Sequence, residues 1–456
     1  MVRAKTTLFL ALILIAGLAL APFAFAQGKP VQPGNATADG FLPSSSCGCH
    51  AARVQEWAPS MHAKAIADPV FLVKVAQAQA EVGEEVTAFC KRCHSPIGNM
   101  TGDPLGEKTP AAAEGVTCMY CHQVVGIDGK PANTSHLVEA NLTRRAQLKD
   151  PSAPHPAAYS ELHTKAEFCG GCHDVNHPGN GTHLETSYSE WVASPYAKEG
   201  VVCQDCHMNS KPGVVGPSKG TACAGGKQRD NIFAMSFVGA NVGQGPAEAS
   251  SALLKSAATV DVSVPEVVPG GSATSLTVTV KNVGAGHYLP TGLTEERQMW
   301  LSVYSEGADG SKTDIGERRF GTVLKDAKGA YPAEMWNAVA VQSDDRIPPR
   351  GSVASDYTFT MPQGAKQAKV VAVLSYKSIP DELATQANVA NPVTEMAALT
   401  KVVYASQAEK DAAPKPVAPT ESPAAGGVNW LPFAIGVVIV AVLAVATVAV
   451  LRSRKS

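Results

Sequence analysis

Four short segments of the sequence carry the same pattern of two cysteines followed by a histidine. On one helical turn, two thiols three residues apart point the same way. This C-x-x-C-H run is the attachment site of c-type haem, in which both thiols form thioethers and the histidine binds the iron. The segments are Cys90-Lys91-Arg92-Cys93-His94, Cys118-Met119-Tyr120-Cys121-His122, Cys169-Gly170-Gly171-Cys172-His173 and Cys203-Gln204-Asp205-Cys206-His207.

Zinc sites and disulfides are the alternative interpretations of paired cysteines. Zinc gives no reason for a histidine directly after every second cysteine, and disulfides explain no histidine at all. All 11 cysteines lie between Cys47 and Cys223, among nearly all of the histidines. Covalently bound haem c is therefore the preferred interpretation.

A fifth segment, Cys47-Gly48-Cys49-His50, is irregular because one residue, not two, separates its cysteines. It could hold a haem through two strained thioethers, or through Cys49 alone. In the second case Cys47 and the lone Cys223 are spare, and an oxidising compartment would let them form a disulfide. We predict five haems and call the segments motifs 1 to 5, at residues 47–50, 90–94, 118–122, 169–173 and 203–207.

Histidines outside the motifs could bind each iron on its second face. Two histidine ligands leave no open position and favour electron transfer over substrate binding. Two further histidines, His177 and His183, lie in or beside a turn-rich run and are weaker candidates. The predicted second ligands are His62, His136, His155, His163 and His287.

An internal repeat relates two parts of this region. Residues 56–63 (EWAPSMHA) match residues 190–197 (EWVASPYA), and Glu-Gly-Val precedes both Cys118 and Cys203. His62 of the first copy corresponds to Tyr196 of the second. Either the second unit draws its ligand from elsewhere, or one haem has a weaker partner. We expect Trp57 and Trp191 to pack against porphyrin faces.

The elements that position these residues change character along the chain. From about Val260 apolar residues alternate, which predicts strands at 260–264, 276–280, 298–304, 354–361 and 369–376. His287 lies in a glycine-rich loop between them. The predicted fold class is α+β multidomain, with a haem-packed, mostly α and irregular multihaem cytochrome domain (27–250), a β-sandwich-like domain (255–404) and a C-terminal transmembrane helix.

The two ends of the chain read as membrane signals. Residues 1–26 resemble a signal peptide that ends in Ala24-Phe25-Ala26. Residues 405–428 read as a Pro/Ala-rich tether, 429–451 as a transmembrane helix and 452–456 as a basic cytoplasmic tail. These features predict a single-pass protein on the extracytoplasmic face of the cytoplasmic membrane, in a periplasm or at an archaeal cell surface.

Composition excludes two other classes of protein. The 456 residues carry a formal charge of −2, which argues against a polybasic nucleic-acid binder. Apolar residues make up 45% of the chain, which argues against disorder.

Several of these motifs together resemble a family. Glu-Trp-x-x-Ser-x-His-Ala, Glu-Gly-Val-x-Cys-x-x-Cys-His, Cys-Gln-Asp-Cys-His-Met and Gly-His-Tyr-Leu-Pro-Thr-Gly are similar to motifs of exported multihaem cytochromes. These are related to the tetrahaem cytochromes that accept electrons from hydroxylamine oxidoreductase. The resemblance implies closely stacked bis-histidine haems, with His62 and His287 as ligands. Met235 stands where relatives tend to carry a histidine, so the resemblance makes Met235 a candidate iron ligand.

We therefore expect a membrane-anchored electron carrier that relays electrons between redox proteins or a quinol-linked membrane complex. No catalytic residue is predicted, and oligomers are compatible with the sequence. One alternative is a multihaem reductase of nitrite, hydroxylamine or a sulfur oxyanion with one open-coordination haem. Another is a subunit of a surface electron-conducting assembly.

Overall fold

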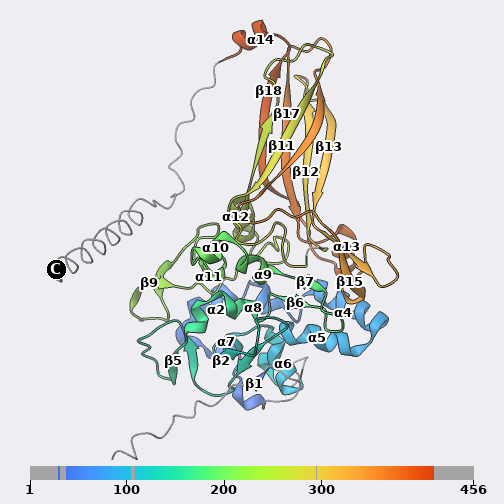
Figure 1. The fold of residues 1–456 in the computed structure, drawn as a ribbon. Helices are drawn as coiled ribbons and strands as arrows, with labels where there is room; N and C mark the ends of the chain where they lie inside the picture. The colour runs from blue at the N-terminus through green and yellow to red at the C-terminus, as the bar shows by residue number, and fades with distance from the viewer. Residues whose placement is uncertain (1–28, 31–36, 104–107, 294, 415–456) are drawn as a thin grey trace, which may run out of the picture. The chain divides into compact units, whose positions relative to one another are not determined.

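The computed structural model describes residues 29–30, 37–103, 108–293 and 295–414. The chain up to Gln407 forms one compact unit, and a second unit begins at Ala408 and is described only as far as residue 414. The first unit is α+β, with short helices and strands in its N-terminal region and long antiparallel strands in its C-terminal region (Figure 1).

The helices of the N-terminal region are short. The longest is α4 (Pro69–Val82). Asp68 caps its start by accepting a hydrogen bond from the Val70 N–H at 3.1 Å, and Pro69 is preorganised for the first turn of α4. Gly83, at φ 89°, then separates it from the next helix. The α-helices are α2 (Ala51–Trp57), α3 (Met61–Lys64), α4 (Pro69–Val82), α5 (Glu84–His94), α6 (Pro96–Thr101), α7 (Cys118–Cys121), α8 (Ala166–Gly170), α9 (Ser187–Val192), α10 (Pro195–Lys198), α11 (Cys203–His207) and α12 (Ala247–Ala257).

Short strands and 3-10 helices connect these α-helices. The strands are β1 (Lys29–Pro30), β2 (Val124–Ile127), β3 (His136–Val138), β4 (Arg144–Ala146), β5 (Ala157–Tyr159), β6 (Val175–Asn176), β7 (His183–Glu185), β8 (Ser218–Thr221) and β9 (Gln228–Ile232). The 3-10 helices are η1 (Ala38–Gly40), η2 (Ser44–Ser46), η3 (Gly48–His50), η4 (Pro110–Glu114) and η5 (Glu161–Thr164).

Two antiparallel sheets form the C-terminal region and share one apolar core. Leu276, Val278 and Val280 alternate along one sheet and face Leu301 and Val303 of the other, all fully buried. The first sheet has the order β10 (Ala258–Ser263), β11 (Ala273–Asn282), β16 (Ser352–Thr360). The second has the order β13 (Lys312–Phe320), β12 (Gln298–Glu306), β17 (Gln367–Lys377), β18 (Thr394–Tyr404).

A further hairpin and three helical segments complete the C-terminal region. They are β14 (Thr322–Asp326), β15 (Ala338–Asp344), η6 (Met335–Asn337), α13 (Asp381–Ala387) and α14 (Gln407–Ala412). The strands expected from alternating apolar residues are all present. Strands β13, β14, β15 and β18 are not among the predicted strands. The sequence of β13, KTDIGERRF, is mostly polar because this strand has an outer position in its sheet.

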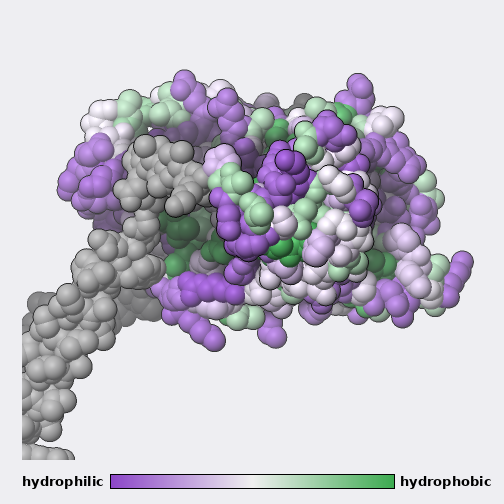
Figure 2. All heavy atoms as spheres, turned by 90° about the horizontal axis from the view of Figure 1, so that it is seen from above, coloured by the Kyte–Doolittle hydropathy of each residue, from purple (hydrophilic) through white to green (hydrophobic). Residues whose placement is uncertain are grey.

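Apolar packing is distributed unevenly between the two regions. The N-terminal core is a small cluster around Ile97, Met100 and Tyr120, whereas the sandwich core joins residues from all its strands from β10 to β18 except β14 and β15. Hydrophilic residues cover much of the face shown in Figure 2, with smaller hydrophobic areas between and below them. The N-terminal region therefore has little protein core of its own.

The expected fold class is wrong in its last component, the C-terminal transmembrane helix. Within the described ranges, no helix is long and apolar enough to cross a bilayer. The predicted spanning segment 429–451 lies outside the described residues, as do the signal peptide 1–26 and the tail 452–456. Of the predicted tether 405–428, residues 407–412 form the short helix α14.

Candidate haem-binding site

Each regular motif lies on or at the end of a helical turn. Motif 2 forms the end of α5, and motif 3 starts at the first residue of α7. Motif 4 starts in the last two residues of α8, and motif 5 coincides with α11. The irregular motif 1 adopts a tighter 3-10 turn, η3, which directly precedes α2. The helical turns hold the two thiols of each regular motif on one side, as thioether attachment to one porphyrin requires.

All five motif histidines share one hydrogen-bonding feature. Each places Nδ1 against an oxygen that can only accept, so Nδ1 carries the proton and Nε2 keeps its lone pair for a metal. The partners are Ala222 O for His50 (2.9 Å), Ala65 O for His94 (3.0 Å), Arg145 O for His122 (2.7 Å), Glu185 Oε1 for His173 (2.9 Å) and Val238 O for His207 (2.6 Å).

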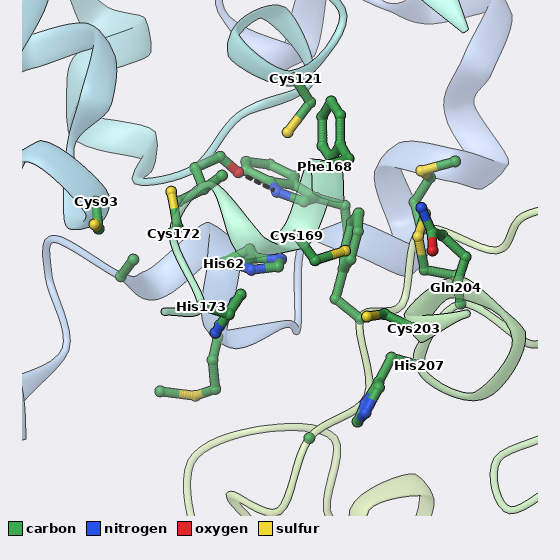
Figure 3. Close-up of a pocket in the computed structure, with 18 of the residues that line it drawn as sticks. His62, Cys93, Cys121, Phe168, Cys169, Cys172, His173, Cys203, Gln204 and His207 are labelled. Carbon is green, nitrogen blue, oxygen red and sulfur yellow. Dashed lines mark hydrogen bonds between the residues drawn. The ribbon is translucent and has the colours of Figure 1, made fainter. Parts of the chain in front are cut away.

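Four motif histidines face a second imidazole. An iron bound to two imidazole nitrogens at about 2 Å each separates the ring centroids by about 6 Å. The observed separations are 6.3 Å for His50–His155, 5.9 Å for His122–His163, 6.1 Å for His173–His62 and 6.2 Å for His207–His287. In Figure 3 the side chains of His62 and His173 are drawn next to each other, with Cys169 near His62.

His94 of motif 2 is the exception. Its ring stacks on Phe71 of α4 with centroids 3.9 Å apart and planes 10° apart. In the described part of the chain it makes no ring contact with a second histidine. Its partner Ala65 O still fixes Nδ1 as the donor, so Nε2 keeps its in-plane lone pair for a metal.

His136 lies elsewhere than opposite a motif histidine. Its Nδ1 is 2.9 Å from the Tyr120 hydroxyl and its Nε2 is 2.7 Å from Phe168 O, so both nitrogens have partners. The ring is buried, and burial lowers the pKa of His136 to about 4. Gly171 is required beside it, because a Cβ there would be 2.3 Å from His136 Nε2.

The other candidate ligands are also separate from the facing pairs. Met235 lines the cavity that the five motifs share, which is described below, and its backbone N–H donates to Glu56 Oε2 at 2.8 Å. His177 Nε2 is 3.1 Å from Trp336 O, and His183 lies on β7 with its side chain exposed. The ligand role of Met235 stays a prediction.

One cavity of 1510 Å³ connects the motifs. It exceeds the about 300–1,000 Å³ of a site for one small molecule. Residues of all five motifs line it, together with His62, His155, His163 and His287. His163 donates from Nε2 to Cys121 O (2.9 Å), and its buried Nδ1 has no hydrogen-bond partner among the described residues. That orphaned nitrogen, which belongs to the ring facing His122, fits a metal ligand.

Burial keeps most of these imidazoles neutral, which is the form that binds iron. It lowers the pKa of His62 and of His163 to about 3 and that of His207 to about 4. His173 differs: burial opposes its protonation, but the Glu185 carboxylate outweighs burial and raises the pKa of His173 to about 9.

Thiols of different motifs are in contact, and these contacts show which motifs are neighbours. The pairs are Cys47 with Cys118, Cys93 with Cys172 and Cys169 with Cys203. Motif 1 is thus beside motif 3, motif 2 beside motif 4, and motif 4 beside motif 5. The Tyr120–His136–Phe168 hydrogen bonds connect motif 3 to the start of motif 4.

The 11 thiols are all free, and Cys47 contacts Cys118 rather than Cys223. Hydrogen bonds still place residues 222–224 along motif 1, because Ala222 O pairs with His50 Nδ1 and Ala224 N donates to Cys49 O at 2.8 Å. Among the described residues, no three histidine, cysteine or acidic side chains converge as a metal-ion site.

The internal repeat has a clear structural counterpart. Trp57 Nε1 donates to Val116 O (2.9 Å), and Trp191 Nε1 donates to Val201 O (2.8 Å), each just before a motif. The second copy has no histidine because Tyr196 has another role. Its hydroxyl donates to Val283 O at 3.1 Å, and its ring packs beside Gly286 of the loop that carries His287.

A buried ion pair holds that loop against the N-terminal region. Glu190 Oε1 accepts from Arg346 Nη1 at 2.5 Å, with both side chains less than a tenth exposed. Glu190 Oε2 accepts from the Tyr288 N–H at 3.0 Å and from Thr291 Oγ1 at 2.9 Å. The residue after His287 is thereby fixed to α9. Sequence patterns did not reveal this pair or Glu185, because neither has a local motif.

Comparison with known proteins gives a family match and an extensive structural likeness. The family model described as cytochrome c554 and c-prime matches residues 46–123, which contain motifs 1 to 3. The chain is similar to the penta-heme cytochrome c552 from Thermochromatium tepidum, with a TM-score of 0.59 and 18% identity over 82% of this chain and 100% of that one. No curated protein matches the sequence.

Two further structures resemble the chain only slightly. They are the CARDB domain of a Pyrococcus furiosus protein (TM-score 0.19, 15% identity, 32% of this chain and 85% of that one) and the superoxide reductase neelaredoxin from Ignicoccus hospitalis (TM-score 0.16, 12% identity, 32% and 78%). The family match and the penta-heme fold together support a multihaem c-type cytochrome with covalently bound haem c.

Proposed function

We propose that this chain is an extracytoplasmic electron relay that holds five haems, four of them between two histidines. The observation that carries the proposal is the set of four facing imidazole pairs with centroids 5.9 to 6.3 Å apart. In each pair the motif histidine donates from Nδ1 and leaves Nε2 for iron. Haem c, when bound, supplies a one-electron iron couple.

The contacts between motifs support a branched path rather than a single line. Motif 4 has thiol contacts with motifs 2 and 5, and His136 links it to motif 3. Motif 1 joins through the Cys47–Cys118 contact to motif 3. We infer that electrons enter and leave at the outer motifs and pass through motif 4.

The partners and location are part of the same proposal. The resemblance to electron acceptors of hydroxylamine oxidoreductase favours a redox protein as donor, and a quinol-linked complex is the other candidate. The signal-like residues 1–26 support export, and N-terminal sequencing of the mature protein should then begin at Gln27.

A haem count combined with low-temperature ferric EPR tests the relay. We expect five haems per chain by pyridine haemochrome and four low-spin irons. A colourless protein, produced in a host with haem-maturation machinery, would refute the proposal. Four haems with motif 1 empty would limit it to the regular motifs.

One observation favours a second function, the reduction of a small nitrogen or sulfur oxyanion or of hydroxylamine. Among the described residues, His94 has a ring contact with Phe71 and none with a second imidazole, so the iron at motif 2 would lack a second histidine and keep an open position. The reductase hypothesis expects one high-spin ferric iron that binds nitrite and turns it over with a chemical reductant. A high-spin iron that binds nitrite without turnover would leave the relay as the function.

A further inference from the structure

The motif 4 histidine has a hydrogen-bond partner unlike those of the other motifs. His50, His94, His122 and His207 each donate from Nδ1 to a neutral backbone carbonyl. His173 donates to the carboxylate of Glu185, with Nδ1 and Oε1 2.9 Å apart. A carboxylate partner makes an imidazole a stronger electron donor to its metal than a carbonyl does.

A local hairpin places this carboxylate. The chain leaves His173, forms β6, turns through residues 177–182 and returns as β7, so that Val175 pairs with Glu185. The turn is closed by the His177 N–H, which donates to Thr182 O at 2.8 Å. Glu185 therefore returns to the histidine of its own motif by a short, hydrogen-bonded path.

Glu185 is held as an anion in a mostly enclosed place. Its side chain is 16% exposed, whereas half of the His173 side chain is exposed toward the cavity that the motifs share. Hydrogen bonds to the ionised form favour it, and Glu185 Oε1 accepts from His173 Nδ1 at 2.9 Å and from Ser187 Oγ at 3.4 Å. A negative charge in this position stabilises ferric over ferrous iron, because it favours the more positive metal.

Motif 4 is also the point where motifs 2, 3 and 5 meet. Cys172 contacts Cys93 of motif 2, and Cys169 contacts Cys203 of motif 5. Phe168, directly before Cys169, accepts the hydrogen bond from His136 that leads to motif 3. Any change in potential at motif 4 therefore affects every route between the branches.

We infer that Glu185 is a positioning residue that makes motif 4 the lowest-potential centre of the relay, so that electrons rest on the outer motifs and cross the hub only briefly. This inference rests on the proposed relay, since it requires haem at motif 4. It assigns Glu185 a role in tuning the order of potentials, beyond holding the ring in place.

The test is a spectroelectrochemical titration of the full-length holoprotein and of Glu185→Gln. Glutamine keeps an acceptor oxygen and the side-chain length but removes the charge. We expect the lowest midpoint potential to rise by at least about 59 mV. For a one-electron couple this is a tenfold change in the equilibrium constant of reduction. Glu161→Gln is the matched control, because the Glu161 carboxylate is exposed and pairs with Lys165 at 3.0 Å.

A second variant assigns the lowest potential independently. His62 faces His173, and methionine as an axial ligand raises a haem potential. His62→Met should therefore remove the lowest-potential step from the wild-type titration. If it removes a higher step, motif 4 is not the lowest-potential centre and the inference is wrong.

The remaining outcomes are also decisive. An unchanged set of potentials in Glu185→Gln would overturn the inference, and so would the loss of one haem, which would make Glu185 a structural residue. A wild-type protein that lacks haem would instead contradict the proposed relay itself.

Discussion

The buried pair of Glu190 and Arg346 provides the sharpest test of the proposal that the C-terminal sheets supply His287 as an iron ligand. Replacing Glu190 by alanine removes the acceptor of four hydrogen bonds, from Arg346, Thr186, Tyr288 and Thr291. Removing one partner of a buried ion pair generally costs about 3–5 kcal/mol.

The remaining contacts of Arg346 reduce that cost. Asp344 Oδ1 and Oδ2 each accept from the same guanidinium at 2.8 Å. Arg346 would therefore not be left as an unpaired buried charge, and we expect a loss of about 3 kcal/mol in the free energy of unfolding. Without the bonds to Tyr288 and Thr291, the loop no longer holds His287 opposite His207.

Two measurements check this prediction. Guanidinium unfolding followed by circular dichroism gives the stability, and ferric EPR should show one additional high-spin iron per chain. Glu199→Gln is the control, because its pair with Arg350 is solvent-exposed and such pairs contribute about 0–1 kcal/mol. If Glu190→Ala loses less than about 1 kcal/mol and keeps every low-spin signal, the loop does not depend on this pair.

Three further predictions concern other parts of the molecule. Gly171→Ala should push His136 from its place and lower the free energy of unfolding by about 2–4 kcal/mol, measured as a lower denaturation midpoint; an unchanged midpoint would contradict the close contact. Burial raises the pKa of Glu295 from 4.5 to about 8. The folded chain therefore binds the extra proton, and stability should fall as pH rises from about 4.5 through about 8. Glu295→Gln should flatten that slope in unfolding curves at pH 5 and pH 9, and equal slopes would refute the assignment. Alkylation of the denatured, unreduced holoprotein followed by peptide mapping should label Cys223, because Cys47 contacts Cys118 and not Cys223; labelling of neither Cys47 nor Cys223 until reduction would favour a disulfide between them.

Local sequence predicted those parts of the site that depend on local spacing. The four regular motifs determine their own helical turns. The repeat has a counterpart in the matching hydrogen bonds of Trp57 and Trp191, while the expected packing of both indoles against porphyrins stays a prediction. Alternating apolar residues likewise indicated the core strands of the sandwich. In a strand with one buried face every second side chain is buried, so apolar residues recur at every second position.

Contacts between distant residues could not be predicted in this way. A histidine near the motifs has similar local surroundings whether it faces iron, as His163 could, or is satisfied by a hydroxyl and a carbonyl, as His136 is. The stacking of Phe71 on His94 joins two helices and has no sequence signature. Glu185 is an ordinary acidic residue until the β6–β7 hairpin returns it to His173.

In the proposed relay, the loop that carries His287 would make completion of the motif 5 centre depend on the order in which the chain is made. Motifs 1 to 5 are all complete by residue 207, but the imidazole opposite His207 emerges only later, and its anchor Arg346 later still. A protein with a truncated or unfolded C-terminal region would thus still bind haem, but the iron at motif 5 would lack its second histidine. The spin state of the iron at motif 5 should therefore report whether the C-terminal region has been synthesised and has folded.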